Sequence, residues 1–193
     1  TVYYYTWIVG NVGLMSIASL VQMIGIPLAF AFPPLLKKTS VVKLMFAGFL
    51  LSAAGYLLNF FADANIVLLA IAAVMTGTGT VPGSMLLALA VLECAEYNEW
   101  KGRPTMSSVI SLAKKVGAAV GSAGLGVMLT MVGYNGTLEV QSDGTLLGIR
   151  LLFSLGPMAL YVVVALSLRG YFRLDKQMKQ IREENEQRRA DKS

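Results

Sequence analysis

The sequence predicts an all-α membrane protein. Of its 193 residues, 55% are hydrophobic and 14% are charged, whereas about 25% of the residues in a soluble domain are charged. The mean hydropathy is +0.63. The apolar residues gather into runs, and most of these runs are close in length to the roughly 20 residues that a helix needs to cross a bilayer. A soluble helical bundle is the alternative, but its helices would carry a polar face that these runs lack.

Five apolar runs are long enough to span, and a short aromatic segment precedes them. We predict a transmembrane bundle over residues 1–168, with helices at about 1–10, 14–36, 44–61, 66–92, 105–132 and 146–168. The first helix is too short to span. We therefore expect five complete transmembrane helices plus the truncated outer end of another, with its aromatic side chains near the membrane interface. An aromatic arm on an intact small protein is the alternative.

The distribution of Lys and Arg orients these helices, because cytoplasmic loops are enriched in both. Cations concentrate in segments 37–43 and 93–104 and in the tail 169–193, which we expect to be cytoplasmic in a multi-pass protein of the cell membrane. The opposite segments carry acidic residues, with Arg150 as their only cation. We expect the tail to form a charged helix. Its apolar stripe suits docking on the membrane face or on a neighbouring helix and consists of Leu174, Met178 and Ile181.

The residue content argues against an enzyme and against a bound cofactor. The sequence has no His and a single cysteine, Cys94, which excludes imidazole catalysis, internal disulfides and most zinc sites. No Gly-rich loop precedes a Lys-Ser or Lys-Thr pair, so a P-loop for ATP is absent. We therefore expect no catalytic residues, no resident cofactor and no metal site in this chain.

Two adjacent lysines are the main candidates for chemistry inside the membrane, where ionisable side chains are costly. If their helix begins at Thr105, Lys115 lies about 15 Å along it, near the bilayer midplane. At 100° per residue, one polar stripe then forms on this helix and contains Ser108, Ser111, Lys115 and Ser122. Such a stripe suits the lining of a solute path. Alternatively, residues 116–132 span alone, and Lys114 and Lys115 are interfacial residues at the end of a surface helix.

Glycines and isolated polar residues suggest further features of the bundle. Residues 75–84 contain Gly77, Gly79, Pro82 and Gly83, which favour either a bent or unwound segment at a binding site or a packed kink. Gly117 and Gly121 form a small-residue pair that favours close packing of helices. Gln22 and Asn59 are single polar residues in apolar runs, and such residues are more often contacts between helices than ligands for a solute.

A cluster of charge follows the third apolar run, residues 66–92. Glu93, Glu96, Glu99 and Arg103 lie in one predicted cytoplasmic segment. The block from Glu96 to Tyr134 begins with Glu-Tyr-Asn-Glu-Trp-Lys-Gly-Arg. A Ser-rich stretch follows, then Ala-Lys-Lys-Val-Gly-Ala-Ala-Val-Gly, and the block ends in Val-Gly-Tyr. This block resembles the glycoside–pentoside–hexuronide:cation symporters, the melibiose-carrier branch of the major facilitator superfamily. The Tyr4-Tyr5 pair, the Lys-Lys loop and the tail also resemble this family.

The resemblance covers essentially the whole chain and matches the carboxy-terminal half of the family. It implies half of a major-facilitator bundle that carries out cation-coupled sugar or glycoside symport by alternating access. Lys115 takes the place of a family lysine near the sugar and cation sites, and the charged segment corresponds to the cytoplasmic gate between the halves. The coupling ion would be Na⁺ or H⁺, with its carboxylate ligands in the amino-terminal half, which is therefore the expected partner.

The chain also departs from the family pattern. The family usually has Asp where this chain has Glu93 and Glu96, and the stretch from Lys101 to Lys115 is about four residues shorter. Four residues are about one helical turn, so Lys115 keeps its face but not its depth. The remaining alternatives are a major-facilitator transporter of a non-sugar solute and a non-transport membrane scaffold. We expect no nucleic-acid partner, because the positive charge follows the loop bias.

Overall fold

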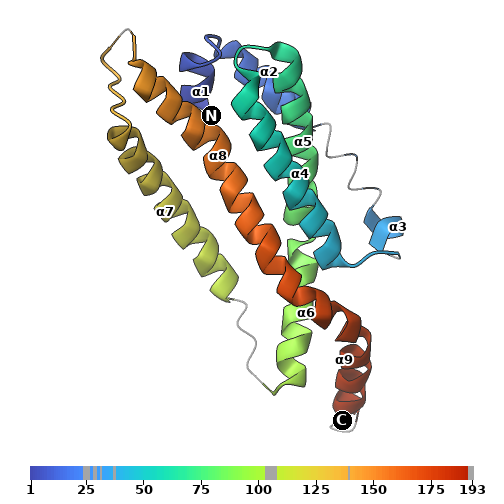
Figure 1. The fold of residues 1–193 in the computed structure, drawn as a ribbon. Helices are drawn as coiled ribbons and strands as arrows, with labels where there is room; N and C mark the ends of the chain where they lie inside the picture. Colours follow the sequence, from blue (N-terminus) through green and yellow to red (C-terminus); the bar gives the residue numbers. More distant parts are fainter. Residues whose placement is uncertain are drawn as a thin grey trace.

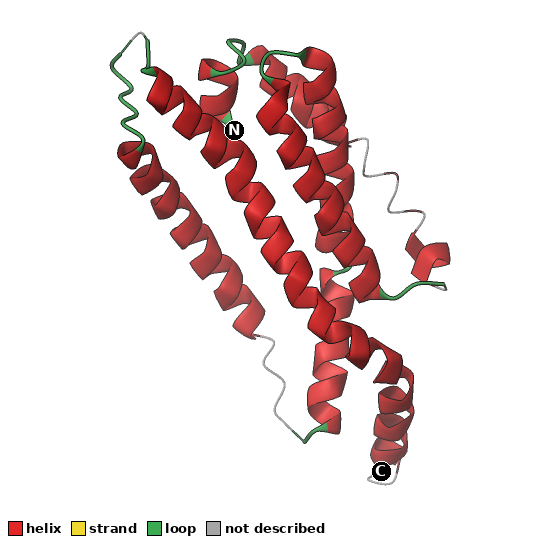
Figure 2. Cartoon of the chain, viewed as in Figure 1, coloured by secondary structure: helices red, strands yellow, loops and turns green. Residues whose placement is uncertain are grey.

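Every regular element that the structure describes is a helix (Figure 2). The computed structural model describes residues 1–23, 27, 30, 32–36, 38–102, 108–138 and 140–190. In chain order the elements are α1 (Val2–Trp7), α2 (Gly13–Gln22), α3 (Phe32–Leu36), α4 (Val41–Ala62), α5 (Ile66–Met85), α6 (Leu87–Trp100), α7 (Ser108–Met131), α8 (Asp143–Leu168), η2 (Arg169–Tyr171) and α9 (Phe172–Ala190). The all-α prediction is confirmed.

Four helical segments in the described ranges are long and apolar enough to cross a membrane, and they are Val41–Ala62, Ile66–Trp100, Ser111–Met131 and Asp143–Leu168. The second combines α5 and α6, which continue each other with an interruption at Leu86. The predicted helix at 14–36 contains α2 and α3, but most of the residues between these two helices lie outside the described ranges. The structure therefore describes spans for four of the five complete predicted helices.

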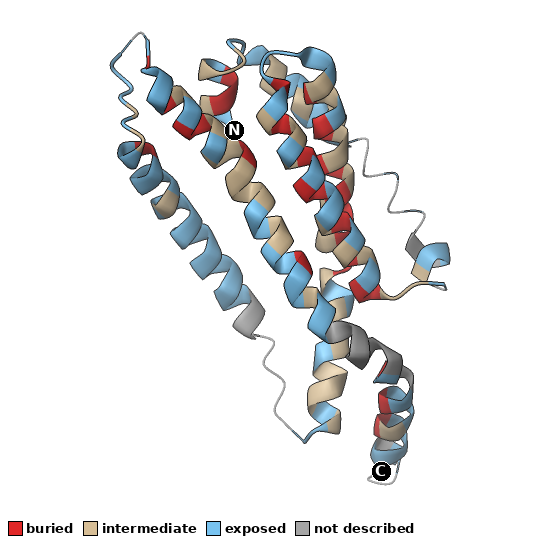
Figure 3. Ribbon diagram, viewed as in Figure 1, coloured by how far each residue is buried: buried red, intermediate tan, exposed pale blue. Residues whose placement is uncertain are grey.

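Helix α4 lies at the centre of the bundle and packs against both α5 and α8 (Figure 1). Helix α2 packs on α5, while α1 contacts α8 near the N-terminal end of that helix. Buried residues gather on α4, α5 and the upper half of α8 (Figure 3). Helix α7 runs antiparallel to α8 and is exposed along almost its whole length. The core of this chain is thus made by α4, α5 and α8.

Glycines in α5 allow its neighbours to approach its backbone. A Cβ atom on Gly79 would lie 2.4 Å from Ser52 Oγ in α4, and one on Gly77 would lie 2.5 Å from the carbonyl oxygen of Gln22 in α2. Real Cβ atoms do not come this close, so only glycine fits at both positions. Of the two alternatives left open for residues 75–84, the structure excludes an unwound segment, because α5 stays helical to Met85, and the close contacts at Gly77 and Gly79 show that these glycines serve packing.

The aromatic segment at the start of the chain is built into the bundle. Tyr4 is completely buried, stacks on Phe153 with ring centroids 4.4 Å apart, and donates a 2.7 Å hydrogen bond from its hydroxyl group to the carbonyl oxygen of Asn59. Tyr5 is also buried. Both tyrosines therefore lie inside the bundle, while the expected position of the aromatic side chains near the membrane interface stays a prediction. The rings of both tyrosines join α1 to α4 and α8.

Helix α7 is joined to α8 through the end that carries Met131. There Thr145 Oγ1 donates a 2.9 Å hydrogen bond to the carbonyl oxygen of Val132, and Leu129 is buried. Gly148 leaves room for Val132, whose Cγ1 would lie 2.5 Å from a Cβ atom at that position. Toward the other end, Ser111–Val120 is exposed throughout. The packing of this chain therefore fixes one end of α7.

Candidate functional site

A polar cavity of about 210 Å³ lies among α1, α2, α4, α5 and α8. It is smaller than the roughly 300–1,000 Å³ of pockets for drug-sized ligands, so its size suits a small solute. Hydroxyl groups, amides and aromatic rings alternate with apolar side chains around it. The lining residues are Thr1, Tyr5, Met15, Ala18, Ser19, Gln22, Tyr56, Asn59, Leu69, Ala73, Thr76 and Phe153.

Thr76 and Gln22 form the polar wall between α5 and α2. The Oγ1 atom of Thr76 lies 2.9 Å from the carbonyl oxygen of Ala72 and 3.5 Å from Gln22 Nε2. Gln22 is exposed, while Asn59, which also lines the cavity, is buried. Amide and hydroxyl groups in an apolar bundle can exchange hydrogen bonds with each other or with the hydroxyl groups of a solute.

The sequence interpretation of Gln22 and Asn59 as contacts between helices was therefore incomplete. Gln22 does face Thr76 across the α2–α5 contact, but both Gln22 and Asn59 also line the cavity. Sequence reasoning missed Thr76 and Tyr56 as lining residues. Their positions gave a weak signal, because each is a hydrogen-bonding side chain inside an apolar run.

Within the described residues, the polar stripe predicted on α7 does not line the polar cavity. Ser111, Lys115 and Ser122 are exposed, and the side chain of Ser108 lies outside the described residues. The hydroxyl group of Ser122 donates to the carbonyl oxygen of Ala118 at 2.9 Å. In the described part of the chain no carboxylate lies within ion-pair distance of Lys115. A partner for this stripe must come from outside the described residues.

The structure bears on the depth of Lys115 along α7. Ser108–Met131 is one uninterrupted helix, so within these residues the surface helix of the alternative, which would end near Lys114 and Lys115, is continuous with the span. The centre of the described helix falls between Ala119 and Val120, which places Lys115 about 7 Å from the centre toward Ser108 at ~1.5 Å per residue. Lys114 follows the same helix but points about 100° away.

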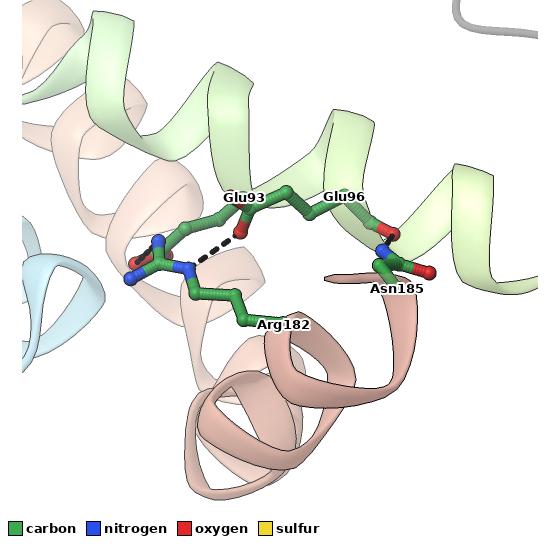
Figure 4. A network of polar contacts seen from close by, with 4 residues as sticks. All are labelled: Glu93, Glu96, Arg182 and Asn185. Atoms are coloured by element: carbon green, nitrogen blue, oxygen red, sulfur yellow. Dashed lines mark hydrogen bonds and ion pairs between the residues drawn. The ribbon is translucent and has the colours of Figure 1, made fainter. Parts of the chain in front are cut away.

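The charged residues 93–99 belong to a helix. We predicted that the helix over 66–92 ends before these acids, and this was wrong for residues 93–100, which form the second half of α6. The physical reason is that α9 packs alongside α6 and supplies partners for its polar side chains. Figure 4 shows Arg182 of α9 reaching toward Glu93 and Glu96. Arg103 lies outside the described residues.

Arg182 and Asn185 hold Glu96 from two sides. Arg182 Nε lies 2.6 Å from Glu96 Oε2, and one of its terminal nitrogens lies 3.8 Å from Glu93 Oε1. The Nδ2 atom of Asn185 donates a 2.9 Å hydrogen bond to the carbonyl oxygen of Glu96. The hydrogen bond to Glu96 raises the pKa of the Arg182 guanidinium above its ordinary value. These contacts join α9 to α6 through side chain and backbone.

Trp100 completes the contact between the two helices. Its indole Nε1 donates a 2.6 Å hydrogen bond to Glu184 Oε2, and its carbonyl oxygen accepts one of 3.0 Å from Arg188. Lys101 lies over the Trp100 ring at 4.8 Å. The hydrogen bond from Trp100, with a second from Gln180, lowers the pKa of Glu184 below its ordinary value. Glu184 therefore accepts the hydrogen bond from Trp100 in its ionised form when α9 packs on α6.

The comparisons with known proteins agree with this architecture. Residues 1–176 match the sequence model of a family described as MFS/sugar transport protein. The chain belongs to this family. Membership confirms the resemblance found in the sequence and makes this chain part of a transporter family rather than an enzyme. The all-helical fold is consistent with part of a major-facilitator bundle.

Several curated relatives of the MFS/sugar transport protein family align with nearly the whole chain. A putative sulfoquinovose importer of Salmonella typhimurium is 31% identical over 91% of this chain and 38% of its own length. Its Escherichia coli counterpart is 31% identical over 97% of this chain and 41% of its own length. An uncharacterized symporter of Bacillus subtilis, YjmB, is 28% identical over 88% of this chain. No solved structure matches.

The chain thus spans about two fifths of the length of the curated relatives that it matches. Within the described part of this family member, carboxylates lie in the second half of α6, in α9 and next to helix ends, as with Asp63 after α4 and Asp143 at the start of α8. Among the described residues no group of three His, Cys, Asp or Glu side chains is arranged to hold a metal ion.

Sequence reasoning missed the pairing of Glu93 and Glu96 with the tail. The structure brings both acids together with Arg182 of the same chain. The expectation that they belong to a gate between two halves of a transporter stays a prediction. A signal was present in the spacing of the tail, because Met178, Ile181 and Asn185 follow each other at helical intervals and are all buried. Glu99 also has a partner in the structure.

Proposed function

We propose that this chain forms the carboxy-terminal half of a secondary transporter that moves a sugar or glycoside by alternating access, coupled to Na⁺ or H⁺. Family membership supports transport of a sugar-like solute. The observation that carries the proposal is the polar cavity inside an otherwise apolar membrane bundle. The lengths of the relatives support an amino-terminal half as partner, with α7 and the end of α6 at the boundary between the halves.

The chemistry of the cavity favours a solute with several hydroxyl groups. Gln22 and Thr76 offer amide and hydroxyl groups on one wall, and Asn59 offers an amide on another. The rings of Tyr5, Tyr56 and Phe153 supply flat apolar surface. A sugar has hydroxyl groups along its edge and C–H groups on its faces, so it matches a site with both kinds of surface.

A sulfonated sugar is a second candidate solute. Two relatives are named as putative sulfoquinovose importers. The described cavity wall contains no Lys or Arg side chain, so the negative group would need a cation from elsewhere. Lys115 is exposed and has no carboxylate partner in the described part of the chain. In this version of the proposal, Lys115 binds the sulfonate instead of fixing a coupling carboxylate.

The orientation follows from the loop charges. We propose that the end of the bundle with α9 and the second half of α6 faces the cytoplasm, and that the membrane is the cell membrane. Glu93, Glu96, Glu99 and Arg103 then belong to an inner gate that closes against basic residues of the amino-terminal half. Carboxylate ligands for the coupling ion would lie in that half, since the five apolar runs of this chain contain no Asp or Glu.

Uptake by the full-length transporter tests the proposal. Radiolabelled sugars and sulfosugars are offered to cells or proteoliposomes under a Na⁺ gradient, a proton gradient or neither. We expect Gln22→Leu and Thr76→Val to reduce initial uptake about fivefold or more, because each removes a hydrogen bond worth about 1 kcal/mol. Thr80→Val is the matched control, since Thr80 lies one turn from Thr76, donates to the carbonyl oxygen of Gly77 and is not among the described lining residues of the cavity.

The outcomes separate the parts of the proposal. If both cavity variants are present in the same amount as the wild-type protein and take up solute normally, the cavity is not the solute site. Uptake that is indifferent to both gradients would remove cation coupling. If the wild-type transporter moves a sulfosugar but not the neutral sugar, the second candidate replaces the first.

A further inference from the structure

The tail helix α9 occupies side chains that the proposed inner gate needs. Arg182 forms an ion pair with Glu96 at 2.6 Å and reaches Glu93 at 3.8 Å (Figure 4). These are two of the acids that the proposed gate would present to the other half of the transporter. A carboxylate that already accepts from Arg182 has less capacity for a second cation, so the two partners compete.

The contact is built so that the tail docks firmly while the ion pair stays exchangeable. Met178, Ile181 and Asn185 are buried, and Asn185 holds the backbone of Glu96 rather than its carboxylate. In contrast, the side chain of Arg182 is 50% exposed and that of Glu96 is 31% exposed. Exposed ion pairs contribute little individually. Docking therefore does not depend on the pair, and the pair can open while α9 remains in place.

A groove gives another cation access to the same acids. It has a volume of about 530 Å³ and lies between α4, α6 and α9. Glu93, Glu96 and Arg182 all line it, together with Glu183 and Glu186. The two extra carboxylates make the groove attractive to a basic side chain that approaches from outside this chain. A competing Lys or Arg can therefore approach the pair without displacing the buried side of α9.

We propose that α9 is a built-in competitor of the inner gate: Arg182 holds Glu93 and Glu96 while the gate is open and yields them to basic residues of the amino-terminal half when the gate closes. This proposal rests on the proposed transport function. A partner that binds the acids only in the open state stabilises that state. The tail therefore biases the carrier toward the inward-open form.

The proposal gives opposite signs for the two sides of the pair. Arg182→Gln frees the acids for the other half and shifts the carrier toward the closed inner gate. Glu96→Gln removes an acid that the closed gate needs and shifts the carrier toward the open inner gate. Each shift should be about two- to fivefold in the ratio of the two forms, the size that a partly exposed ion pair allows.

Thiol labelling of a cysteine introduced into the inner cavity of the full-length carrier, in a background without other reactive cysteines, measures this ratio. The variants are Arg182→Gln, Glu96→Gln and both together, and the double variant should behave like Glu96→Gln alone. Arg188→Gln is the matched control, because Arg188 donates to the carbonyl oxygen of Trp100, whereas the ion pairs of Glu93 and Glu96 described above are with Arg182. We expect the control to change labelling by less than half the Arg182 effect.

Hydrogen exchange of α9 accompanies the labelling and shows whether the tail stays docked. Shifts of the same sign for Arg182→Gln and Glu96→Gln would overturn the competition and leave a purely structural contact. An unprotected α9 in the wild-type carrier would overturn it as well. Neither measurement uses a solute, so a carrier that transports no sugar but shows the opposite shifts would contradict the proposed substrate while supporting the role of the tail.

Discussion

Gly48 of α4 and Gly79 of α5 bring the backbones of two membrane helices into direct contact. A Cβ atom on Gly48 would lie 2.6 Å from the carbonyl oxygen of Gly79, and one on Gly79 would lie 2.5 Å from that of Gly48. The relation is reciprocal, so neither side can accept a methyl group without moving the helices apart. The contact between α4 and α5 thus depends on the absence of a Cβ atom at both glycines.

Gly79→Ala should destabilise this chain strongly. The added methyl group meets backbone oxygen and Ser52 Oγ, and overpacking of this kind typically costs about 1–3 kcal/mol. Gly121→Ala on α7 is the control, because nothing lies within 4 Å of its Cβ position. Thermal unfolding of the 193-residue chain in detergent measures both. Equal melting temperatures for the two variants would contradict the close approach of α4 and α5.

Two buried serines should respond differently to loss of the hydroxyl group. Ser52 and Ser154 are both completely buried, but Ser52 donates to the carbonyl oxygen of Thr76 at 3.3 Å, whereas Ser154 Oγ has no partner in the described part of the chain. Ser52→Ala should lower the free energy of unfolding by about 1 kcal/mol, and Ser154→Ala should leave it unchanged or raise it. Denaturant titration in detergent checks the order, which a reversed result would contradict.

Lys115 and Lys114 should separate in transport assays of the full-length carrier. If Lys115 lies on the solute or coupling path, Lys115→Ala abolishes coupled uptake, because a charge buried between the halves needs its partner. Lys114→Ala should retain most uptake, since this side chain points about 100° away. Surface expression is the control for insertion. If both variants lose only a small and similar part of their uptake, both lysines are interfacial residues rather than parts of the transport path.

Docking of α9 should depend on the protonation of Glu184. The hydrogen bonds from Trp100 and Gln180 lower its pKa below the ordinary value of 4.5. Because the pKa of Glu184 is lower when α9 is docked, the ionised carboxylate stabilises docking at any pH above the ordinary pKa. This stabilisation is lost as the pH falls through the lowered pKa. We expect Trp100 fluorescence to be constant from pH 7 to about 5 and to change below about 4.5.

The variant Glu184→Gln isolates this effect from the other acids of α6 and α9. Its amide keeps an oxygen that can accept from Trp100 but does not titrate. The part of the fluorescence change that belongs to Glu184 should therefore be missing from the variant. A pH profile identical to that of the wild type would show that the Trp100–Glu184 contact does not report docking.

Much of the helical layout is readable from the sequence, because apolar runs and capping residues are local signals. Ser40, Asn65 and Ser142 each accept a backbone hydrogen bond at the start of a helix, and residues of this type commonly occupy that position. The four spans lie over four of the apolar runs for the same reason. Such features depend on a few neighbouring residues and need no knowledge of the tertiary fold.

The remaining features depend on contacts between distant residues. Glycines permit both an unwound helix and a close approach of backbones, so the sequence alone could not decide between these for residues 75–84. The stripe on the tail was visible, but nothing local identifies α6 as its partner. The cavity escaped prediction for the same reason, because Gln22, Asn59 and Thr76 come from three different helices.

The one-ended attachment of α7 gives this helix mechanical leverage. Val132 and Thr145 act as a fulcrum, and Lys115 lies sixteen residues from Met131, or about 24 Å along the helix. A tilt of about 10° around that fulcrum would carry the ammonium group roughly 4 Å sideways. A displacement of that size can make or break an ion pair. A small change at the contact between α7 and α8 would thus produce a larger displacement at Lys115 than at Met131.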